Sequence, residues 1–295
     1  MKLLTRERGA GGALSEAYLQ CAELARSHYE NFSVASWLLP NSKRPHVYSI
    51  YAYCRTVDDL GDEQEGDRLR ALDAWEQDLL RCYSGTPSHP YLIALQRTIQ
   101  EFDIPVEPFL MLVEANRMDQ TTTRHATYED IEHYCRHSAN PVGRLVLYVF
   151  GYRDAERQML SDCTCTALQL ANFWQDVARD YAMGRVYIPQ EDMARFSYSE
   201  EMLAEMTFNR EFRELMAFEV ERARELFRRG LRLVDTLDGR LKLDVALFSR
   251  GGLKVLEAIE KQGFNVLGRR PTVSKATKIR LMLTTALRLR LGLGV

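Results

Sequence analysis

Residues 51–63 read Tyr51-Ala52-Tyr53-Cys54-Arg55-Thr56-Val57-Asp58-Asp59-Leu60-Gly61-Asp62-Glu63. In a helix, one line of polar side chains runs along this stretch, made of Tyr51, Arg55, Asp58 and Asp62, with Asp59 one position further round. Asp58 and Asp62 are a turn apart, with their Cβ atoms about 5–6 Å from each other. Because carboxylates at this spacing repel, the DDxxD pattern predicts a divalent cation with oxygen ligands.

The apolar residues around this motif predict that the whole chain is helical. Val47, Ile50, Cys54 and Val57 recur at helical spacing and indicate a core-facing stripe over 44–64. No series of alternating strands is found, so we expect an all-α fold. Of the nine prolines, Pro45, Pro90 and Pro108 lie in the first two residues of expected helices, and only Pro141 falls in the interior of one, which it is expected to kink or break. The expected helices are 14–29, 44–64, 67–83, 90–102, 107–121, 127–150, 155–182, 209–237, 240–262 and 273–291.

A second polar stripe lies in the expected helix 155–182. It consists of Gln169, Asn172, Asp176 and Asp180, with apolar and aromatic residues on the opposite side. A single DDxxD is more often a solvated helix end, but two such stripes are harder to explain in that way. Facing each other across a bundle, they would bind several Mg²⁺ ions, which usually complete their shells with water and substrate phosphate. A diphosphate on an apolar tail suits the 14 Tyr, 12 Phe and 3 Trp.

Composition and motifs exclude several other classes of protein. The net charge of -2 argues against a nucleic-acid binder. The longest apolar run, Leu145 to Phe150, is far shorter than the roughly 20 residues of a membrane span, and no secretory signal begins the chain. We therefore expect a cytoplasmic protein with reduced cysteines. No linker or repeat divides the chain, which predicts a single helical domain over residues 1–295.

Common catalytic signatures are missing from the sequence. His133 and His137 are four residues apart, but the stretch lacks the glutamate of HExxH, so packing or surface histidines are the simpler interpretation. There is no P-loop, no GxGxxG after a strand and no GxSxG. The paired carboxylate stripes therefore remain the main evidence for chemistry.

The two stripes together resemble the paired signatures of the squalene and phytoene synthase family. A Gly184-Arg185-Val186-Tyr187-Ile188-Pro189 loop follows the second stripe, as it does in that family. The resemblance extends from about His28 to about Arg270. It implies an all-α isoprenoid synthase fold, a class I terpenoid synthase helical bundle with a central active-site cavity. It also implies Mg²⁺-dependent chemistry on prenyl diphosphates.

The resemblance assigns roles to individual residues. It places Asp58, Asp62, Asn172 and Asp176 on the Mg²⁺ ions, with Asp59 and Asp180 extending the acidic walls. Tyr51 and Arg55 would approach the diphosphate, and Gln169 would contribute to substrate binding on the second helix. Tyr134 matches a tyrosine placed near the reacting carbons.

Several departures from the family pattern point to its hydroxysqualene synthase branch in the bacterial hopanoid pathway. Glu30 stands where a basic residue is common, Gln175 replaces a usual arginine, and Gly251-Gly252 replaces a frequent tyrosine. Ser138-Ala139-Asn140 is polar where the family is apolar. The implied reaction converts presqualene diphosphate and water to hydroxysqualene and diphosphate. Asn140 and Ser138 could bind the water, and polar packing at a helix break explains them equally well.

Three alternatives remain open from the sequence. The first is a head-to-head synthase that joins two farnesyl diphosphates to presqualene diphosphate or a (dehydro)squalene, and the second is a terpene cyclase. The third, from another class, is a non-catalytic relative that acts in binding or assembly. Such a protein would have little reason to keep both aspartate stripes.

The C-terminal segment predicts peripheral contact with membranes. Residues 261–295 contain eight Lys or Arg and no acid. Because the apolar residues near 284–291 alternate irregularly, we expect a mainly electrostatic attraction to anionic lipid. A solvated helix paired with the acidic residues of 51–80 is the competing interpretation.

Overall fold

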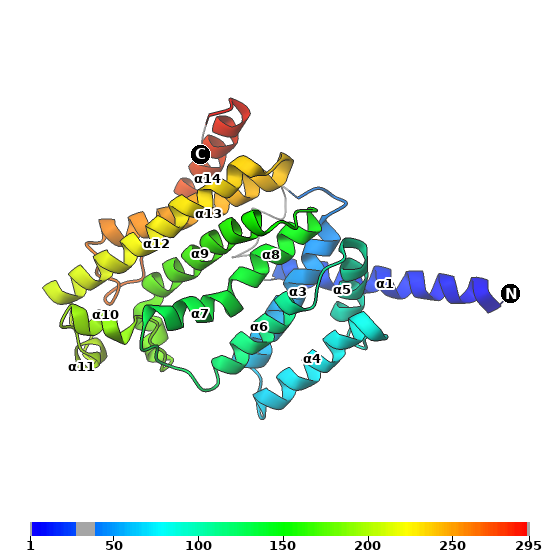
Figure 1. Cartoon of the computed structure of the whole chain (residues 1–295), viewed down its shortest axis with the longest axis horizontal. Coiled ribbons are helices and arrows are strands. Elements are labelled where there is room, and N and C mark those ends of the chain that lie inside the picture. The colour runs from blue at the N-terminus through cyan, green and yellow to red at the C-terminus, as the bar shows by residue number, and fades with distance from the viewer. Residues whose placement is uncertain (1, 28–38, 294–295) are drawn as a thin grey trace. The chain divides into compact units, whose positions relative to one another are not determined.

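The computed structural model of the 295-residue chain describes residues 2–27 and 39–293, with side chains from residue 12 onward. Within these ranges the backbone is helical and contains no β-strand beyond an isolated bridge between Arg124 and Val186 (Figure 1). The helices are α1 (Lys2–Ser27), α3 (Arg44–Asp62), α4 (Arg68–Ser84), α5 (Pro90–Phe102), α6 (Glu107–Met118), α7 (Tyr128–Ser138), α8 (Asn140–Val149), α9 (Ala155–Ala182), α10 (Gln190–Arg195), α11 (Glu200–Ala204), α12 (Arg210–Thr236), α13 (Gly239–Lys261) and α14 (Lys275–Arg290).

The all-α prediction is confirmed, and most of the helix bounds agree within a few residues. The helix expected over 127–150 is divided into α7 and α8 at Ala139, because Pro141 has no N–H to continue the hydrogen-bond ladder. The first helix begins at Lys2 rather than at residue 14, while its predicted end at 28–29 lies outside the described residues. The short helices α10 and α11 were not predicted, since five or six residues show no periodicity.

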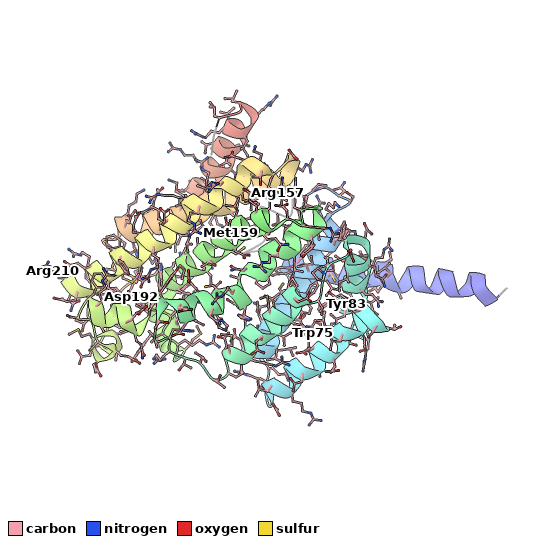
Figure 2. All side chains as sticks on the ribbon, viewed as in Figure 1. Trp75, Tyr83, Arg157, Met159, Asp192 and Arg210 are labelled. Carbon is pink, nitrogen blue, oxygen red and sulfur yellow. The ribbon has the colours of Figure 1, made fainter. Side chains whose placement is uncertain are left out.

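The helices form two compact units. Unit 1 contains the described residues of Met1–Gln120 and Arg144–Arg153, and unit 2 contains those of Thr121–Gly143 and Asp154–Val295. In unit 1, α3 packs against α1, α4, α5 and α6. The buried Tyr53 of α3 stacks on Trp75 of α4 and donates a hydrogen bond to the carbonyl of Phe109. Trp75 is labelled on the ribbon of α4 in Figure 2. These contacts fix the rotation of α3 about its axis, and hence the direction in which its DDxxD motif points.

In unit 2, α9 packs along α12 and α13. A Cβ on Gly230 of α12 would lie only 2.3 Å from Thr164 Oγ1 of α9, so glycine permits the close approach of these helices. Arg222 of α12 is 2.7 Å from Asp192 Oδ2 of α10 and 3.0 Å from Glu219 Oε2. Both acids are buried, and burial raises the pKa of Glu219 to about 8. This ion cluster attaches α10 to α12.

No helix among the described residues is both long and apolar enough to cross a bilayer. The single-domain interpretation of residues 1–295 stays a prediction.

Candidate functional site

The first predicted stripe lies on α3 in unit 1. Arg55 makes ion pairs with two acids of its own helix end, at 2.5 Å to Asp59 Oδ1 and 2.9 Å to Glu63 Oε1. Tyr51 is half-buried, and burial raises the pKa of its hydroxyl. The planar guanidinium of Arg55 has five N–H donors, so it can bridge these carboxylates or bind phosphate oxygens.

Asp58 lies in a crowded part of this stripe. Its side chain reaches solvent, but the surrounding protein atoms displace part of its hydration shell. This desolvation is the largest cause that raises the pKa of Asp58 to about 6, and the negative charge of Asp62 acts in the same direction. A cation bound by these carboxylates would remove the repulsion.

Asn116 of α6 is a neighbour of Asp58 that sequence reasoning missed. Its Nδ2 donates to Asp58 Oδ1 at 3.4 Å and to the carbonyl of Leu112. A Cβ on Gly61 would lie 2.1 Å from Asn116 Oδ1, so glycine in the DDxxD motif leaves room for this amide. Gln120 donates to the carbonyl of Gly61 at 3.0 Å. The small residue within the motif was the available signal of a close helix contact.

The second stripe lies on α9 in unit 2, opposite the buried Trp174. Asn172 is exposed, and Gln169, Asp176 and Asp180 are half-buried. Desolvation, followed by the charge of Asp176, raises the pKa of Asp180 to about 7. The oxygen ligands therefore lie on one helix face, as the spacing predicts, and two of the acids interact unfavourably with each other.

Arg270 is a neighbour of the second stripe that sequence reasoning missed. Its Nε and Nη2 lie 2.5 and 2.7 Å from the two carboxylate oxygens of Asp176, and Nη2 also donates to Gln175 Oε1 at 3.0 Å. Gln175, which stands where the family usually has arginine, is buried and donates its own amide to the carbonyl of Pro271. Gln175 thus fixes the segment that directs Arg270 at the second stripe.

An aromatic cluster in unit 2 surrounds Tyr134, the tyrosine that the resemblance places near the reacting carbons of the substrate. Tyr134 of α7 is buried, with its ring centroid 6.1 Å from Phe173 and 5.8 Å from both Tyr187 and His125. Phe173 and Tyr187 stack at 3.8 Å with an angle of 8° between their planes. Such rings present negative faces that attract a cation.

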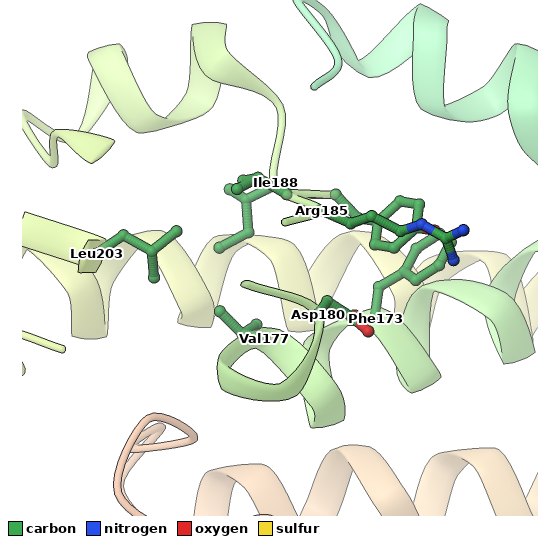
Figure 3. A pocket seen from close by; sticks show the side chains of 8 residues that line it. Phe173, Val177, Asp180, Arg185, Ile188 and Leu203 are labelled. Carbon is green, nitrogen blue, oxygen red and sulfur yellow. The ribbon is translucent and has the colours of Figure 1, made fainter. Parts of the chain in front are cut away.

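The loop 184–189 brings Tyr187 to this cluster. Gly184 adopts φ +81°, and Val186 donates its N–H to the carbonyl of Thr123 at 2.9 Å. Together with Phe173 and Asp180 of α9, the loop encloses a small cavity whose polar end is formed by Asp180 and Arg185 (Figure 3). Charged and aromatic side chains therefore meet within one part of unit 2.

The polar residues at the break between α7 and α8 differ in their bonding. Asn140 is buried, and its Oδ1 accepts a hydrogen bond from Thr166 Oγ1 at 2.9 Å, which agrees with polar packing. Ser138 Oγ is buried without a hydrogen-bond partner among the described residues. The predicted departure at Glu30 lies outside the described residues.

The donor chemistry of both stripes fits Mg²⁺. In the part of the chain that the structure describes, no three Asp, Glu, His or Cys side chains are close enough to enclose a metal by themselves. Mg²⁺ does not require such a cage, because it is usually bound through one or two carboxylates while water and substrate phosphates complete the octahedron. The crowded oxygens of Asp58 and Asp180 match this mode of binding.

The helical fold and the two aspartate-rich faces agree with the family assignment. A model of squalene/phytoene synthase matches residues 25–277, and the chain belongs to this family. Its members are prenyltransferase-type synthases that use prenyl diphosphates, and the fold is that of the all-helical class I isoprenoid synthases.

Particular relatives are similar over nearly the whole chain. The squalene synthase HpnC from Alicyclobacillus acidocaldarius is 48% identical, with a TM-score of 0.84 over 87% of this chain and 99% of that one. A dehydrosqualene synthase solved with a ligand is 26% identical, with a TM-score of 0.87 over 95% of this chain and 99% of that one. The 15-cis-phytoene synthase of Synechococcus elongatus is 30% identical over 93% of this chain and 94% of its own.

Proposed function

We propose that the protein converts presqualene diphosphate and water to hydroxysqualene and diphosphate in hopanoid or squalene biosynthesis, with Mg²⁺ as cofactor. The observation that carries the proposal is the arrangement along α9. Asn172, Asp176 and Asp180 supply oxygen ligands there, while Phe173 on the same helix contacts Tyr134 and Tyr187. The helix α9 thus carries both oxygen ligands suited to the metal-bound diphosphate and an aromatic ring suited to stabilising a carbocation.

The first step of the proposed reaction breaks the carbon–oxygen bond to the diphosphate. The electron pair leaves with the diphosphate, whose charge would be balanced by donors from Arg55 and Arg270. Mg²⁺ ions would supply Lewis acid chemistry to the leaving group. On α3 they would be held by Asp58 and Asp62 with support from Asp59, and on α9 by Asn172 and Asp176 with support from Asp180. Tyr51 and Gln169 would hold the diphosphate through hydrogen bonds.

The second step uses the apolar part of unit 2. The cyclopropylcarbinyl cation rearranges, and the ring of Tyr134 with its aromatic neighbours would stabilise the positive charge. A water oxygen then forms the new carbon–oxygen bond and loses a proton to the departed diphosphate. Asn140 retains its amide N–H₂ beyond the bond to Thr166, and the hydroxyl of Ser138 is buried nearby in sequence, so both are candidates to orient this water.

The preference for a substrate with one diphosphate rests on Gln175. Where family members commonly have arginine, this buried amide is bonded to the backbone at Pro271 and to Arg270. One cationic group fewer suits an enzyme that binds one diphosphate. The similarity to the squalene synthase HpnC supports a role on the route to squalene.

A head-to-head condensation of two farnesyl diphosphates is the second candidate. It is favoured by the similarity to 15-cis-phytoene synthase over most of both chains. A non-catalytic binding or assembly role is disfavoured, because both stripes keep their acids and the acids are arranged on helix faces in the structure.

Product analysis distinguishes these candidates. Purified protein is incubated with presqualene diphosphate or farnesyl diphosphate, each with Mg²⁺ and with or without NADPH, in ¹⁸O-labelled water. We expect labelled hydroxysqualene from presqualene diphosphate without NADPH. Efficient turnover of farnesyl diphosphate with no use of presqualene diphosphate would replace this proposal with the head-to-head reaction.

A further inference from the structure

The C-terminal helix α14 of unit 2 presents apolar side chains on two different faces. Leu281 and Thr285 are buried, and Thr285 accepts a hydrogen bond from Arg250 of α13 at 3.0 Å. Four other large aliphatic residues are exposed, at 55% for Ile279, 61% for Leu283, 57% for Leu287 and 62% for Leu291. The first face attaches α14 to α13, and the second faces solvent.

The exposed residues form a continuous ridge. Ile279, Leu283, Leu287 and Leu291 are each four positions apart, and at about 100° per residue each step advances only about 40° around the helix. We refer to these four residues as the α14 ridge. Single exposed leucines are ordinary on protein surfaces, but a contiguous row on one helix marks an interaction surface.

Basic side chains border the α14 ridge. All five Lys and Arg of α14 are exposed, and the segment 261–295 contains no acid. Among the described residues, Lys275, Lys278 and Arg280 make no ion pair. An apolar stripe flanked by Lys and Arg is typical of helices that lie in the interface of an anionic bilayer, where the apolar side chains enter the acyl boundary and the cations contact headgroups.

We propose that the α14 ridge and its flanking cations bind the surface of an anionic lipid bilayer, with α14 lying in the plane of the interface. A second copy of the chain is a poorer occupant. In a two-fold dimer through this ridge the same cationic patches would meet, and like charges placed together weaken an interface. A bilayer supplies both the apolar layer and the negative charge.

The proposal does not depend on which prenyl diphosphate the enzyme uses, so its test needs no turnover. Full-length protein is sedimented with vesicles of phosphatidylglycerol and phosphatidylcholine, or of phosphatidylcholine alone, at low and high salt. We expect binding to the anionic vesicles at low salt, weaker binding at high salt and little binding to neutral vesicles.

Paired variants separate the apolar and electrostatic contributions. The double substitution Lys278→Ala/Arg280→Ala should lower the partition coefficient by roughly fivefold for each charge removed. Leu283→Ser/Leu287→Ser should weaken binding to anionic vesicles, and the remaining binding should depend on salt as it does in the unchanged protein. The matched controls are Leu69→Ser on α4 and Arg232→Ala on α12, both exposed in the structure, which should bind as the unchanged protein does.

Three outcomes would overturn the proposal. The unchanged protein could fail to bind anionic vesicles at low salt. The variants in the ridge could bind as well as the controls, with circular dichroism showing that all are folded. Light scattering could instead reveal a dimer that dissociates on Leu283→Ser/Leu287→Ser, in which case the ridge binds a second copy.

Discussion

A buried carboxylate in unit 2 should make stability depend on pH. Asp244 of α13 is 3% exposed, and neither of its carboxylate oxygens has a hydrogen-bond partner among the described residues. Burial raises its pKa from the ordinary 3.8 to about 7, against the opposing charge of Arg240. Folding therefore disfavours the ionised form, and Asp244→Asn removes the ionisation.

The size of the effect follows from the shift in pKa. Because the pKa is higher in the folded state, the penalty is absent well below pH 4, grows as pH rises and is complete above the folded pKa. A shift of one pKa unit corresponds to about 1.4 kcal/mol, so the full penalty on the folded state is about 4 kcal/mol. Between pH 5 and pH 8, the free energy of unfolding of the asparagine variant should rise relative to the unchanged protein by about 2.5 kcal/mol.

Urea unfolding followed by circular dichroism at several pH values measures this difference. An unsatisfied amide in the variant has its own cost of about 1–3 kcal/mol, but that cost does not vary with pH. The exposed Asp235→Asn on α12 is the matched control and should show no comparable trend. A stability difference for Asp244→Asn that stays constant from pH 5 to pH 8 would refute the reasoning.

Three other predictions concern the stripes and the packing of α13. Asp58→Asn or Asp176→Asn, or excess EDTA, should abolish diphosphate release while circular dichroism stays unchanged; full activity would contradict metal binding at the stripes. Arg270→Gln should weaken apparent Mg²⁺ affinity roughly 10–100-fold in titrations of activity, because the diphosphate that binds together with the ion loses a partner, and Lys should restore it only in part because it lacks the planar fork of N–H donors. Gly252→Ala should lower the free energy of unfolding by about 1–3 kcal/mol, because the added Cβ would lie 2.2 Å from a buried phenylalanine ring. Gly251→Ala has open space around the added Cβ and should raise the free energy of unfolding by about 0.5–1 kcal/mol. Equal melting temperatures of the two variants would contradict this.

The sequence predicted the helices and their polar faces well, because both follow from local spacing. The periodicity of apolar residues and the positions of the prolines locate the helices, and a proline inside one of them marks the division of α7 from α8. The line of Tyr51, Arg55, Asp58 and Asp62 depends only on the geometry of α3. Such features need no knowledge of the packing between helices.

The partners of these residues could not be predicted, because they come from distant parts of the chain. Asn116 is 58 residues from Asp58, and Arg270 is 94 residues from Asp176. Nothing in the spacing of a single helix indicates which side chain will lie opposite. The raised pKa of Asp58 and that of Asp180 likewise depend on how tightly the neighbouring helices exclude water.

The α14 ridge shows a different limit of sequence reasoning. Helical periodicity is visible when one face is apolar and the other polar. In α14, Leu281 packs toward α13 while Leu283 and Leu287 are exposed on another face, so the two apolar rows obscure each other in the sequence. Irregular alternation therefore hid an apolar surface instead of indicating its absence.

The arginines paired with the two stripes would link substrate binding to metal binding in the proposed reaction. Arg55 is paired with Asp59, and Arg270 with both oxygens of Asp176. Phosphate oxygens accept hydrogen bonds from the same fork of N–H donors as a carboxylate does, so a diphosphate can replace the aspartate as the partner of each arginine. A carboxylate released in this way regains free lone pairs for a cation. Substrate and Mg²⁺ would then each strengthen the binding of the other, which would explain why an aspartate of each stripe is paired with an arginine.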